Sequence, residues 1–279
     1  MATSVLITGI RGLIGSHLKI ACEALGYTVY GTTRADSIES TLNLLRQLSP
    51  SYIFHTAAEL IDETKMFCTN VSLTHAILHY CKTAKASLKR LVVIGSSSEY
   101  GRRPEPMAEH MSLEPETIYE GTKAAATMLA RSFSITYGIP ILIIRPFTVY
   151  GPGEKPSKFI SLLLALPDKI RLSEGVHDYV YIEDFVRILL EVMSSCKRLF
   201  DIVNIGTGKQ TTNLEVVQTV ERLTGHIFSM EPAQAKPYDS SSWVCDTEYL
   251  RTTYGLTANT TLEEGLKYTI RFLNNGTYN

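Results

Sequence analysis

The sequence predicts an α/β fold, in which a doubly wound parallel sheet is followed by a smaller mixed α/β lobe. Short apolar runs alternate with helical patterns through the first half of the chain, which is typical of consecutive βαβ units. A chain of 279 residues, 44% of them hydrophobic, is long enough for such a sheet and an attached lobe. Glycine and proline cluster at Gly151–Gly153, which predicts domains over 1–155 and 156–279 with some segments crossing between them.

Each predicted element follows from the spacing of its apolar residues. In the first half, strands are expected at Val5–Thr8, Thr28–Gly31, Tyr52–Thr56, Arg90–Gly95 and Ile141–Arg145. Helices are expected there at Leu13–Leu25, Ile38–Leu48, Asn70–Lys85 and Tyr119–Tyr137. The second half is less regular, with helices expected at Lys158–Ala165, Ile182–Ser194, Asn213–Leu223 and Thr261–Asn274 and a strand at Asp201–Ile205.

Composition limits the kind of partner. The net charge of −1 gives no basic surface for nucleic acid or a membrane, and no apolar run approaches the ~20 residues of a membrane span. The N-terminus lacks the basic segment and cleavage site of a signal peptide, and five scattered cysteines indicate free buried thiols in a reducing compartment. We therefore expect a cytoplasmic protein. No metal site is predicted, because His75 and His79 share a predicted helix without a supporting carboxylate.

A glycine-rich turn, Thr8–Gly15, connects the first predicted strand to the first predicted helix. Gly9 permits a tight turn, Gly12 lets a pyrophosphate approach the backbone, and Gly15 lets the helix pack closely on the strand. The helix N-terminus then offers free N–H groups and a positive dipole end to the phosphates. This context predicts a Rossmann-like dinucleotide-binding domain, with cofactor contacts from Gly9, Arg11, Gly12, Leu13, Ile14 and Gly15.

The end of the second predicted strand indicates which dinucleotide binds. Enzymes that use NAD usually have an acidic residue there for the ribose 2′-hydroxyl, whereas this sequence has Gly31, followed by Arg34. A guanidinium can pair with a 2′-phosphate that an acid would repel. NADP(H) is therefore the predicted cofactor, and NAD stays open because Asp36 lies close by.

Tyr119 and Lys123 lie four residues apart, on one face of a predicted helix. A free tyrosine has a pKa of about 10, and a nearby ammonium favours the phenolate and lowers that pKa. Hydride transfer at a carbinol carbon requires a proton to move on its oxygen, which such a tyrosine can do. Lys123 would also hold the ribose hydroxyls of the nicotinamide.

A serine-rich run, Ser96–Ser98, follows the fourth predicted strand. A hydroxyl at the carboxyl end of a central strand lies where the active sites of open α/β sheets form. Ser96 or Ser97 would hydrogen-bond the carbonyl oxygen of a substrate at this point.

In this order, the motifs resemble those of the extended short-chain dehydrogenase/reductase family, in its sugar-nucleotide epimerase, dehydratase and reductase branch. The resemblance runs along nearly the whole chain. It rests on Thr8–Gly15, His55–Ala58, Asn70-Val71, the serine strand ending in Tyr100-Gly101, Tyr119–Lys123, Arg145–Gly153, His177–Asp184, Asn204–Gly208 and Leu262–Leu266. Several motifs in one order are far more specific than any of them alone.

The resemblance implies roles for particular residues. The catalytic groups of the family, a Ser or Thr, a Tyr and a Lys, fall on Ser96, Tyr119 and Lys123, with Ser97 as the alternative to Ser96. Further cofactor contacts fall on Thr56, Ala57, Ala58, Lys123 and Pro146. The C-terminal lobe would bind a nucleoside-diphosphate sugar, and two chains would form a homodimer through a four-helix bundle of Asn70–Lys85 and Tyr119–Tyr137.

Departures from the family pattern limit the reaction. Dehydratases of the family carry Asp-Glu, or at least Glu, after the catalytic Thr, so Ser97 and Ser98 argue against 4,6-dehydration. Glu99 follows, where a hydrophobic residue is usual, and the run is most similar to 4-keto-6-deoxy-sugar nucleotide reductases.

Only one helix fits between Arg34 and Tyr52, so one strand–helix unit of the family fold is missing. The expected substrate contacts are Ser97, Ser98, Thr148, His177 and Lys236, although Thr148 and His177 replace the usual Asn and Arg.

These residues predict an NADPH-dependent reductase of a 4-keto (6-deoxy) nucleotide sugar, in which Tyr119 supplies the proton. The alternative is an NAD-dependent 4-epimerase of a nucleotide sugar, since epimerases of the family generally keep NAD tightly held between two half-reactions. A non-catalytic dinucleotide-binding sensor is the third hypothesis. The presence of Ser96, Tyr119 and Lys123 argues against a sensor, which needs only the glycine turn.

Overall fold

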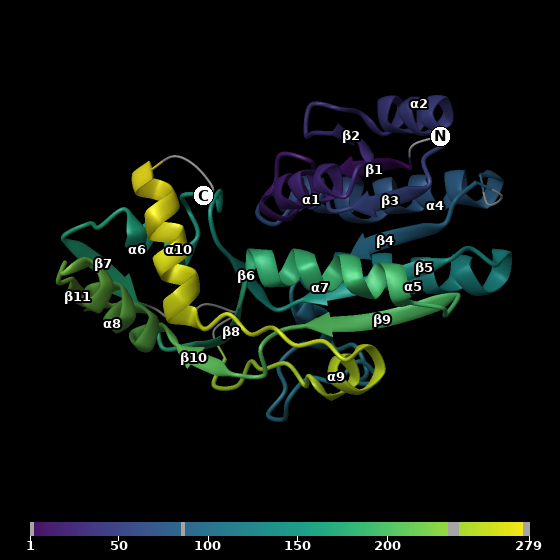
Figure 1. Ribbon diagram of the computed structural model, residues 1–279. Helices are drawn as coiled ribbons and strands as arrows, with labels where there is room; N and C mark the ends of the chain where they lie inside the picture. Colours follow the sequence, from purple (N-terminus) through teal and green to yellow (C-terminus); the bar gives the residue numbers. More distant parts are fainter. Residues whose placement is uncertain (1–2, 85–86, 234–239, 276–279) are drawn as a thin grey trace.

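The computed structural model describes residues 3–84, 87–233 and 240–275. Its larger part is a sheet of six strands in the order β2-β1-β3-β4-β5-β9 (Figure 1). The strands are β1 (Ser4–Thr8), β2 (Thr28–Thr32), β3 (Tyr52–His55), β4 (Arg90–Ile94), β5 (Ile141–Pro146) and β9 (Phe200–Ile205). Every neighbouring pair is parallel, so all six carboxyl ends lie at one edge, which faces a smaller lobe (Figure 1).

Helices cover both faces of this sheet. One face carries α1 (Leu13–Ala24) and α7 (Ile182–Ser195), and the other carries α2 (Ile38–Leu48), α4 (Leu73–Thr83) and α5 (Ile118–Tyr137). Successive strand residues alternate between the two apolar layers, with Val92 and Leu142 in one and Leu91 and Ile141 in the other. The central strands are therefore buried on both faces, as a parallel sheet requires.

The smaller lobe combines short strands with three helices. A three-stranded sheet is formed by β10 (Gln210–Thr212), β8 (Val176–Tyr181) and β6 (Thr148–Tyr150), and a two-stranded sheet by β7 (Lys169–Leu172) and β11 (Ser229–Pro232). The helices of this lobe are α6 (Phe159–Leu164), α8 (Asn213–Thr224) and α10 (Leu262–Asn275). A further helix, α9 (Glu248–Tyr254), packs near β9 at the edge of the large sheet (Figure 1).

The predicted fold class is confirmed, and the missing strand–helix unit is visible in the strand order. In dinucleotide-binding sheets, two further strands usually lie outside the first strand on one side. Among the described strands, only β2 lies there, because the chain passes from β2 through α2 directly to β3 on the other side of β1. Two elements from the second half of the chain lie on the large sheet, since α7 packs on α1 and β9 pairs with β5.

The helix predicted at Asn70–Lys85 begins earlier than the sequence suggested. It starts with α3 (Glu63–Met66), where Asp62 accepts the Thr64 N–H, and continues through a π-helical turn (Phe67–Ser72) into α4. Asn70 lies inside this turn and exchanges hydrogen bonds of 2.8 and 2.9 Å with the backbone of Glu59. Lys85 lies outside the described residues. The short strands β6, β7, β8, β10 and β11 were not predicted.

Two further expectations concern membranes and thiols. Within the described part of the chain, no helix has both the length and the apolar content that crossing a bilayer requires. All five cysteines are free; four are buried as expected, but Cys68 is exposed on the π-helical turn.

Asp178 of β8 joins the smaller lobe to the end of the large sheet. Its side chain is fully buried, and Oδ1 accepts hydrogen bonds from the N–H and hydroxyl of Thr207 at 2.8 and 2.6 Å. Oδ2 accepts the backbone N–H groups of Gly208 and Cys245 at 2.9 and 3.1 Å. One carboxylate therefore fixes the segment that leaves β9 and the strand-like segment around Cys245.

Replacing Asp178 with alanine leaves these donors without their acceptor. We expect the free energy of unfolding to fall by about 3 kcal/mol or more, because a buried unsatisfied donor costs about 1–3 kcal/mol. Urea unfolding followed by circular dichroism measures this change. The control is Asp62→Ala, which removes a more exposed helix cap and should cost clearly less. Equal losses in the two variants would contradict the assignment.

Candidate active site

The glycine-rich turn follows β1, where its backbone touches the loop after β3. Gly9 has a φ of +68°, and a Cβ on it would lie 2.9 Å from the Cα of Ala57. A Cβ on Gly15 would lie 2.3 Å from the carbonyl oxygen of Gly9. Helix α1 begins at Leu13, directly after the exposed Gly12, which has no side chain to cap it. The first N–H groups of α1 are therefore open to a phosphate, and the turn fits a dinucleotide.

Hydroxyl groups hold the loops after β1 and β3 together. The Thr56 hydroxyl donates to the carbonyl oxygen of Thr8 at 2.6 Å, and the N–H of Ala57 donates to the Thr8 hydroxyl at 3.2 Å. The buried His55 ring also bonds to the Thr8 hydroxyl, and burial lowers the pKa of His55 to about 3, so the ring is neutral. The other predicted cofactor residues at this edge are Ala58 and Pro146.

The absence of an acid at the end of β2 has a steric cause. A Cβ on Gly31 would lie 2.4 Å from Cδ1 of Ile10, a residue of the glycine turn. Any side chain at position 31 would displace Ile10 and with it the turn. The glycine that the sequence showed in place of an acid is therefore a packing requirement of the turn itself.

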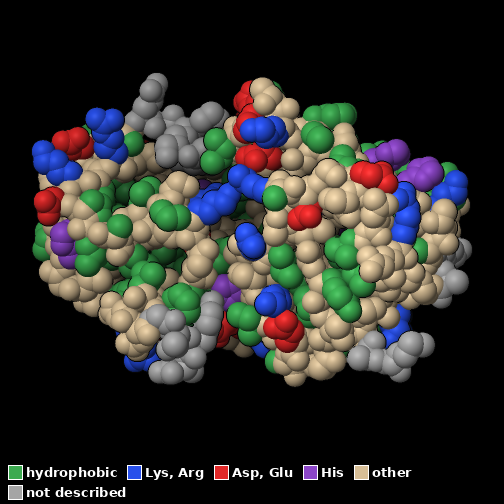
Figure 2. Space-filling model, turned by 90° about the horizontal axis from the view of Figure 1, so that it is seen from above, with side chains coloured by type: hydrophobic (Ala, Val, Ile, Leu, Met, Phe, Trp, Pro, Cys, Tyr) green, Lys and Arg blue, Asp and Glu red, His purple; other side chains and the backbone are tan. Residues whose placement is uncertain are grey.

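Arg34 lies just beyond β2 in a basic environment. Its guanidinium is 69% exposed and pairs with Glu59 at 3.2 Å, while Asp36 accepts an N–H of its own loop. Burial and the neighbouring Arg34 charge lower the pKa of Lys155, the Glu59 carboxylate opposes this fall, and Lys158 adds a smaller contribution. Figure 2 shows Lys and Arg side chains gathered near the middle of the face seen from above, between the two lobes. This environment suits a phosphate group.

The three predicted catalytic residues come together at the carboxyl end of β4. Ser96 follows β4, and its hydroxyl lies beside the phenol of Tyr119 in the first turn of α5, where it lowers the pKa of that phenol. One turn further along α5, the buried Lys123 donates to the carbonyl oxygen of Ile94. Thr117 caps α5 in a reciprocal pair with Glu120, which fixes where the helix begins and hence where Tyr119 lies.

Burial shifts the two titratable groups in opposite directions. It lowers the pKa of Lys123 to about 8, so this amine is mainly protonated at neutral pH. It raises the pKa of Tyr119 to about 12, and the hydrogen bond with Ser96 offsets only part of this rise. The prediction of a lowered Tyr119 pKa is wrong for this structure, because burial dominates that pKa and the Lys123 amine instead bonds the carbonyl oxygen of Ile94.

The two candidate serines lie in different environments. Ser96 is half-buried, and its hydroxyl shares a 2.7 Å hydrogen bond with Ser98 besides its bond to Tyr119. Ser97 is buried, and its hydroxyl accepts a hydrogen bond of 3.2 Å from the indole N–H of Trp243. The geometry therefore favours Ser96 as the residue that contacts a substrate oxygen, with Ser98 beside it. Ser97 instead anchors the only tryptophan of the chain.

A buried ion pair beneath this site was not predicted from the sequence. Glu99 and Arg145 are joined at 3.0 Å, with side chains 0% and 2% exposed. Arg145 also donates to the hydroxyl of Tyr100 at 2.8 Å, and that hydroxyl donates to Asn204 at 2.8 Å. A charged residue at the end of the apolar run 141–144 is a signal for a buried partner. The partner itself could not be identified from the sequence.

The predicted substrate residues of the smaller lobe lie on its three-stranded sheet. Thr148 begins β6 and pairs with Tyr179 of β8, and His177 of β8 pairs with Thr211 of β10. The His177 ring packs edge-on against Tyr179, with ring centroids 5.7 Å apart. Both Thr148 and His177 are half-buried on the three-stranded sheet. Lys236 lies outside the described residues.

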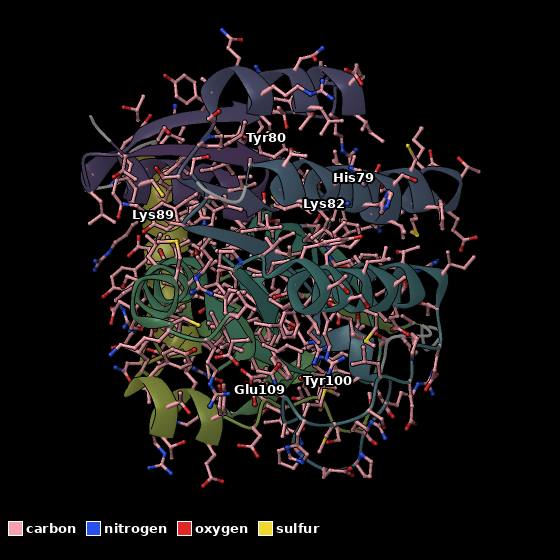
Figure 3. All side chains as sticks on the ribbon, turned by 90° about the vertical axis from the view of Figure 1, so that its right-hand side faces the viewer. His79, Tyr80, Lys82, Lys89, Tyr100 and Glu109 are labelled. Carbon is pink, nitrogen blue, oxygen red and sulfur yellow. The ribbon has the colours of Figure 1, made fainter. Side chains whose placement is uncertain are left out.

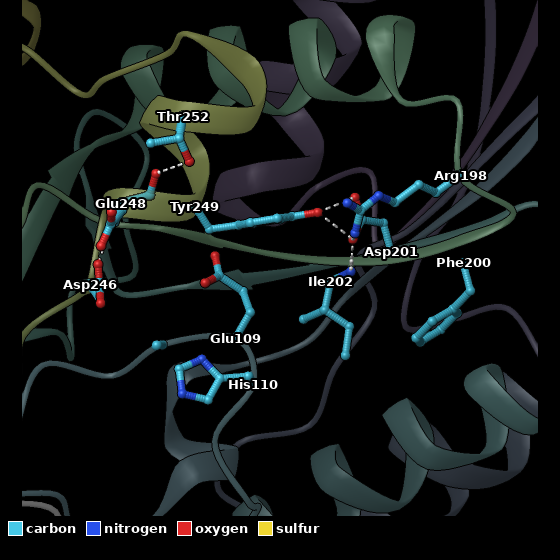
Figure 4. Close-up of a pocket in the computed structure, with 11 residues that line it drawn as sticks. Glu109, His110, Arg198, Phe200, Asp201, Ile202, Asp246, Glu248, Tyr249 and Thr252 are labelled. Carbon is cyan, nitrogen blue, oxygen red and sulfur yellow. Dashed lines mark hydrogen bonds and ion pairs between the residues drawn. The ribbon is translucent and has the colours of Figure 1, made fainter.

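A separate cavity of about 490 Å³ lies between β9 and α9 (Figure 4). Its lining includes Glu109 and Asp201, and Tyr249 points across it and donates to Asp201. Burial raises the pKa of Glu109 to about 7. Figure 3 places Glu109 at the opposite end of the molecule from α2. The residues predicted to be catalytic do not line this cavity.

The parallel sheet, the open helix N-terminus and the grouped hydroxyl, phenol and amine define a dinucleotide-dependent enzyme of the extended short-chain dehydrogenase/reductase class. Residues 5–206 match the model of the NAD dependent epimerase/dehydratase family, and the chain belongs to that family. The resemblance found in the sequence motifs is therefore confirmed.

Individual relatives act on nucleotide sugars. The chain is 27% identical over 318 residues to the trifunctional UDP-glucose 4,6-dehydratase/UDP-4-keto-6-deoxy-D-glucose 3,5-epimerase/UDP-4-keto-L-rhamnose-reductase RHM1 of Arabidopsis thaliana, covering 96% of this chain and 46% of that protein. The chain thus spans less than half the length of that relative. It is 26% identical over 314 residues to the uncharacterized UDP-glucose epimerase YtcB of Bacillus subtilis, covering 96% and 97% of the two chains.

A solved structure extends the similarity to three dimensions. The structure of MoeE5 in complex with UDP-glucuronic acid and NAD matches with a TM-score of 0.90 and 28% identity, covering 98% of this chain and 100% of that chain. The similarity to a solved structure therefore extends over nearly the whole of this chain.

The two serines can be distinguished by fluorescence. Ser97→Ala removes the acceptor of the Trp243 N–H, so we expect the emission spectrum of this single tryptophan to shift. The unfolding free energy should also fall by about 1–3 kcal/mol, because the indole donor becomes unsatisfied. Ser96→Ala is the matched control and should leave the emission unchanged. Identical spectra for the two variants would show that Ser97 does not anchor Trp243.

Proposed function

We propose that the protein uses NADPH to reduce the 4-keto group of a (6-deoxy) nucleotide sugar. The observation that carries this proposal is the group formed by Ser96, Tyr119 and Lys123 at the carboxyl edge of the sheet, with the tyrosine kept protonated. Ser97 and Ser98 stand where a dehydratase would need acids, which supports reduction over dehydration. Membership of the epimerase/dehydratase family supports a nucleotide sugar as the substrate.

Each residue has a defined part in this reaction. A bound nicotinamide dinucleotide would supply the hydride. Ser96 donates a hydrogen bond to the carbonyl oxygen of the sugar, which orients the carbonyl and polarises it. Tyr119 donates its proton to the same oxygen, and a pKa of about 12 keeps it in the protonated form that this step needs. Lys123, largely charged near neutral pH, would hold the ribose hydroxyls of the nicotinamide.

The choice of NADPH rests on the end of β2. Ile10 fills the space beside Gly31, so no acid can approach a ribose 2′-hydroxyl from that position. Arg34 has a largely exposed guanidinium near Lys155 and can share its donors between Glu59 and a 2′-phosphate.

The second candidate function is an NAD-dependent 4-epimerase of a nucleotide sugar. NAD is the dinucleotide in the MoeE5 structure, and the similar protein from B. subtilis is described as a UDP-glucose epimerase. The ion pair between Arg34 and Glu59 also favours this reading, since a 2′-phosphate would have to compete with the carboxylate. An epimerase would need Tyr119 to act first as a base, which its raised pKa opposes.

We also propose that two chains form a homodimer through α4 and α5. These helices pack side by side on the outer face of the sheet. Met128 and Ile135 of α5 are 50% and 59% exposed, and Figure 3 places His79 and Lys82 on the neighbouring α4. Apolar side chains exposed on such a helix pair are suited to burial against a second copy.

A panel of 4-keto nucleotide sugars, assayed with NADPH and NADH, tests the proposed activity. We expect NADPH absorbance to fall and a 4-hydroxy product to form. Tyr119→Phe should reduce turnover by about 10²–10⁴-fold and leave NADPH affinity nearly unchanged, because it removes only the proton donor. Tyr268→Phe, on the surface of α10, is the control and should be fully active.

Two results would overturn this proposal. The first is undiminished turnover in Tyr119→Phe. The second is protein that retains NAD through purification and interconverts C4 epimers without net use of the cofactor, which would establish the epimerase.

Arg34→Ala tests the choice of cofactor. We expect the affinity for NADPH to fall about tenfold or more, since a hydrogen bond to a charged group contributes about 1.5–3 kcal/mol. The affinity for NADH should change little, because NADH lacks the 2′-phosphate. Calorimetric titration measures both, and Arg46→Ala on the exposed face of α2 is the control. An equal loss for the two cofactors would contradict a 2′-phosphate contact.

A further inference from the structure

Glu99 occupies a fully buried position one residue beyond the serine run. Its Oε1 accepts the backbone N–H of Ser96 at 2.8 Å, and the Ser96 hydroxyl accepts the N–H of Ser98 at 3.2 Å. These reciprocal bonds cap the 3₁₀ turn Ser97–Tyr100 and fix the conformation of Ser96. The carboxylate is therefore bonded directly to the backbone of the residue that contacts Tyr119.

The other side of the carboxylate is held equally firmly. Oε2 accepts from Nε of Arg145 at 3.0 Å, and Arg145 is anchored by the hydroxyl of Tyr100 at 2.8 Å. The guanidinium also lies over the Tyr100 ring, 4.6 Å from its centroid. A Cβ on Gly95 would lie 2.5 Å from Oε1, so a glycine there makes room for the carboxylate. Gly95 after β4, Arg145 of β5 and Tyr100 of the 3₁₀ turn thus all pack around the Glu99 carboxylate or its partner.

Such a pair is not explained by stability. Two charges lose their hydration on burial, and a buried pair can often be replaced by apolar residues of similar volume without loss of stability. A charged pair that touches the backbone of Ser96 has a further consequence, because its field acts on the groups beside it in a medium of low polarity. Lys123 and Tyr119 are the titratable groups in question, since the Lys123 amine bonds the carbonyl oxygen of Ile94, next to the Gly95 that packs against the Glu99 carboxylate.

We propose that Glu99 is a positioning residue, which fixes Ser96 through its backbone N–H and keeps Lys123 in its charged form, while Arg145 holds Glu99 in place. The proposal rests on the catalytic roles proposed above for Ser96, Tyr119 and Lys123. Glu99 itself touches neither substrate nor cofactor in this scheme and acts through its neighbours.

The shifts of the neighbouring groups support this role. Burial lowers the pKa of Lys123, and the charge of Glu99 opposes that fall. Burial raises the pKa of Tyr119, the bond with Ser96 lowers it, and the charge of Glu99 adds to the rise. Loss of the Glu99 charge would therefore move both pKa values down, leaving the amine neutral over more of the physiological range.

The other charged and titratable groups around Lys123 do not substitute for Glu99. Among the described residues, His55 of β3 is the other group whose pKa is shifted by the Lys123 charge; the nearest charged residues in the sequence of β5 and α5 are Arg145 and Glu120, with Tyr119 one turn before Lys123. His55 is neutral above a pKa of about 3, and Arg145 is cationic. Glu120 is bound to the backbone N–H groups of Glu116 and Thr117 at the helix start.

The test measures the titration of Lys123 directly and needs no substrate. Protein labelled with ¹³C at the lysine ε-carbons is titrated by NMR, and the Lys123 signal is assigned by its loss in Lys123→Met. We expect a midpoint of about 8 in the unaltered protein. In Glu99→Gln, which keeps an acceptor for the Ser96 N–H, the midpoint should fall by about one pH unit. Glu215→Gln, the same change in the capping pair of α8, should leave it unmoved.

An unchanged Lys123 midpoint in folded Glu99→Gln would overturn the proposal. If the unpaired Arg145 prevents folding, the double variant Glu99→Gln/Arg145→Met replaces it. Because loss of the Arg145 cation alone would raise the Lys123 midpoint, the reference is then Arg145→Met, and the midpoint of the double variant must lie below that of Arg145→Met. A midpoint well below neutrality in the unaltered protein would also overturn it, because Lys123 would then not be held charged. A shifted midpoint in protein that reduces no 4-keto sugar would refute the proposed activity and retain the role of Glu99.

Discussion

The parallel pairing of the six strands is the constraint on which the site depends. Because every strand runs in the same direction, the loops after β1, β3, β4 and β5 emerge at one edge of the sheet. The glycine turn, the hydroxyl-bonded loop of Thr56 and the serine run therefore meet, although they are distant in sequence. Helix α5 then has only to begin at the right residue, which the cap formed by Thr117 and Glu120 ensures.

Burial gives this edge its electrostatic character. Withdrawal from water disfavours every charged form, so it lowers the pKa values of His55 and Lys123 and raises that of Tyr119. A neutral histidine at the end of β3 bonds to Thr8 of β1 and Thr74 of α4, and a protonated phenol is ready to donate. The nearby buried charges are accommodated by partners, as in the pair of Glu99 with Arg145. The protonation states available at the site thus depend on burial and on which buried charges, such as Glu99 and Arg145, are paired.

Prediction from the sequence succeeded where an element depends on residues that lie close together in the chain, and failed where it depends on distant segments. The alternation of apolar runs located the strands of the large sheet, and the glycine spacing located the turn after β1, because both signals are local. The short strands of the smaller lobe were missed, since β10 and β6 have three residues each and gain their order from pairing with β8. The start of the helix before α4 was also missed, because a π-helical turn shifts the register there.

The sequence by itself determined the doubly wound fold, the dinucleotide turn and the helical spacing of Tyr119 and Lys123, because each depends on residues close together in the chain. Only the tertiary structure decided that Ser96 meets Tyr119 while Ser97 meets Trp243, and that Gly31 makes room for Ile10. It also decided that Glu99 pairs with Arg145 and that burial raises the pKa of Tyr119. Contacts and burial depend on how separate elements pack, and spacing along one chain does not encode that packing in any simple pattern.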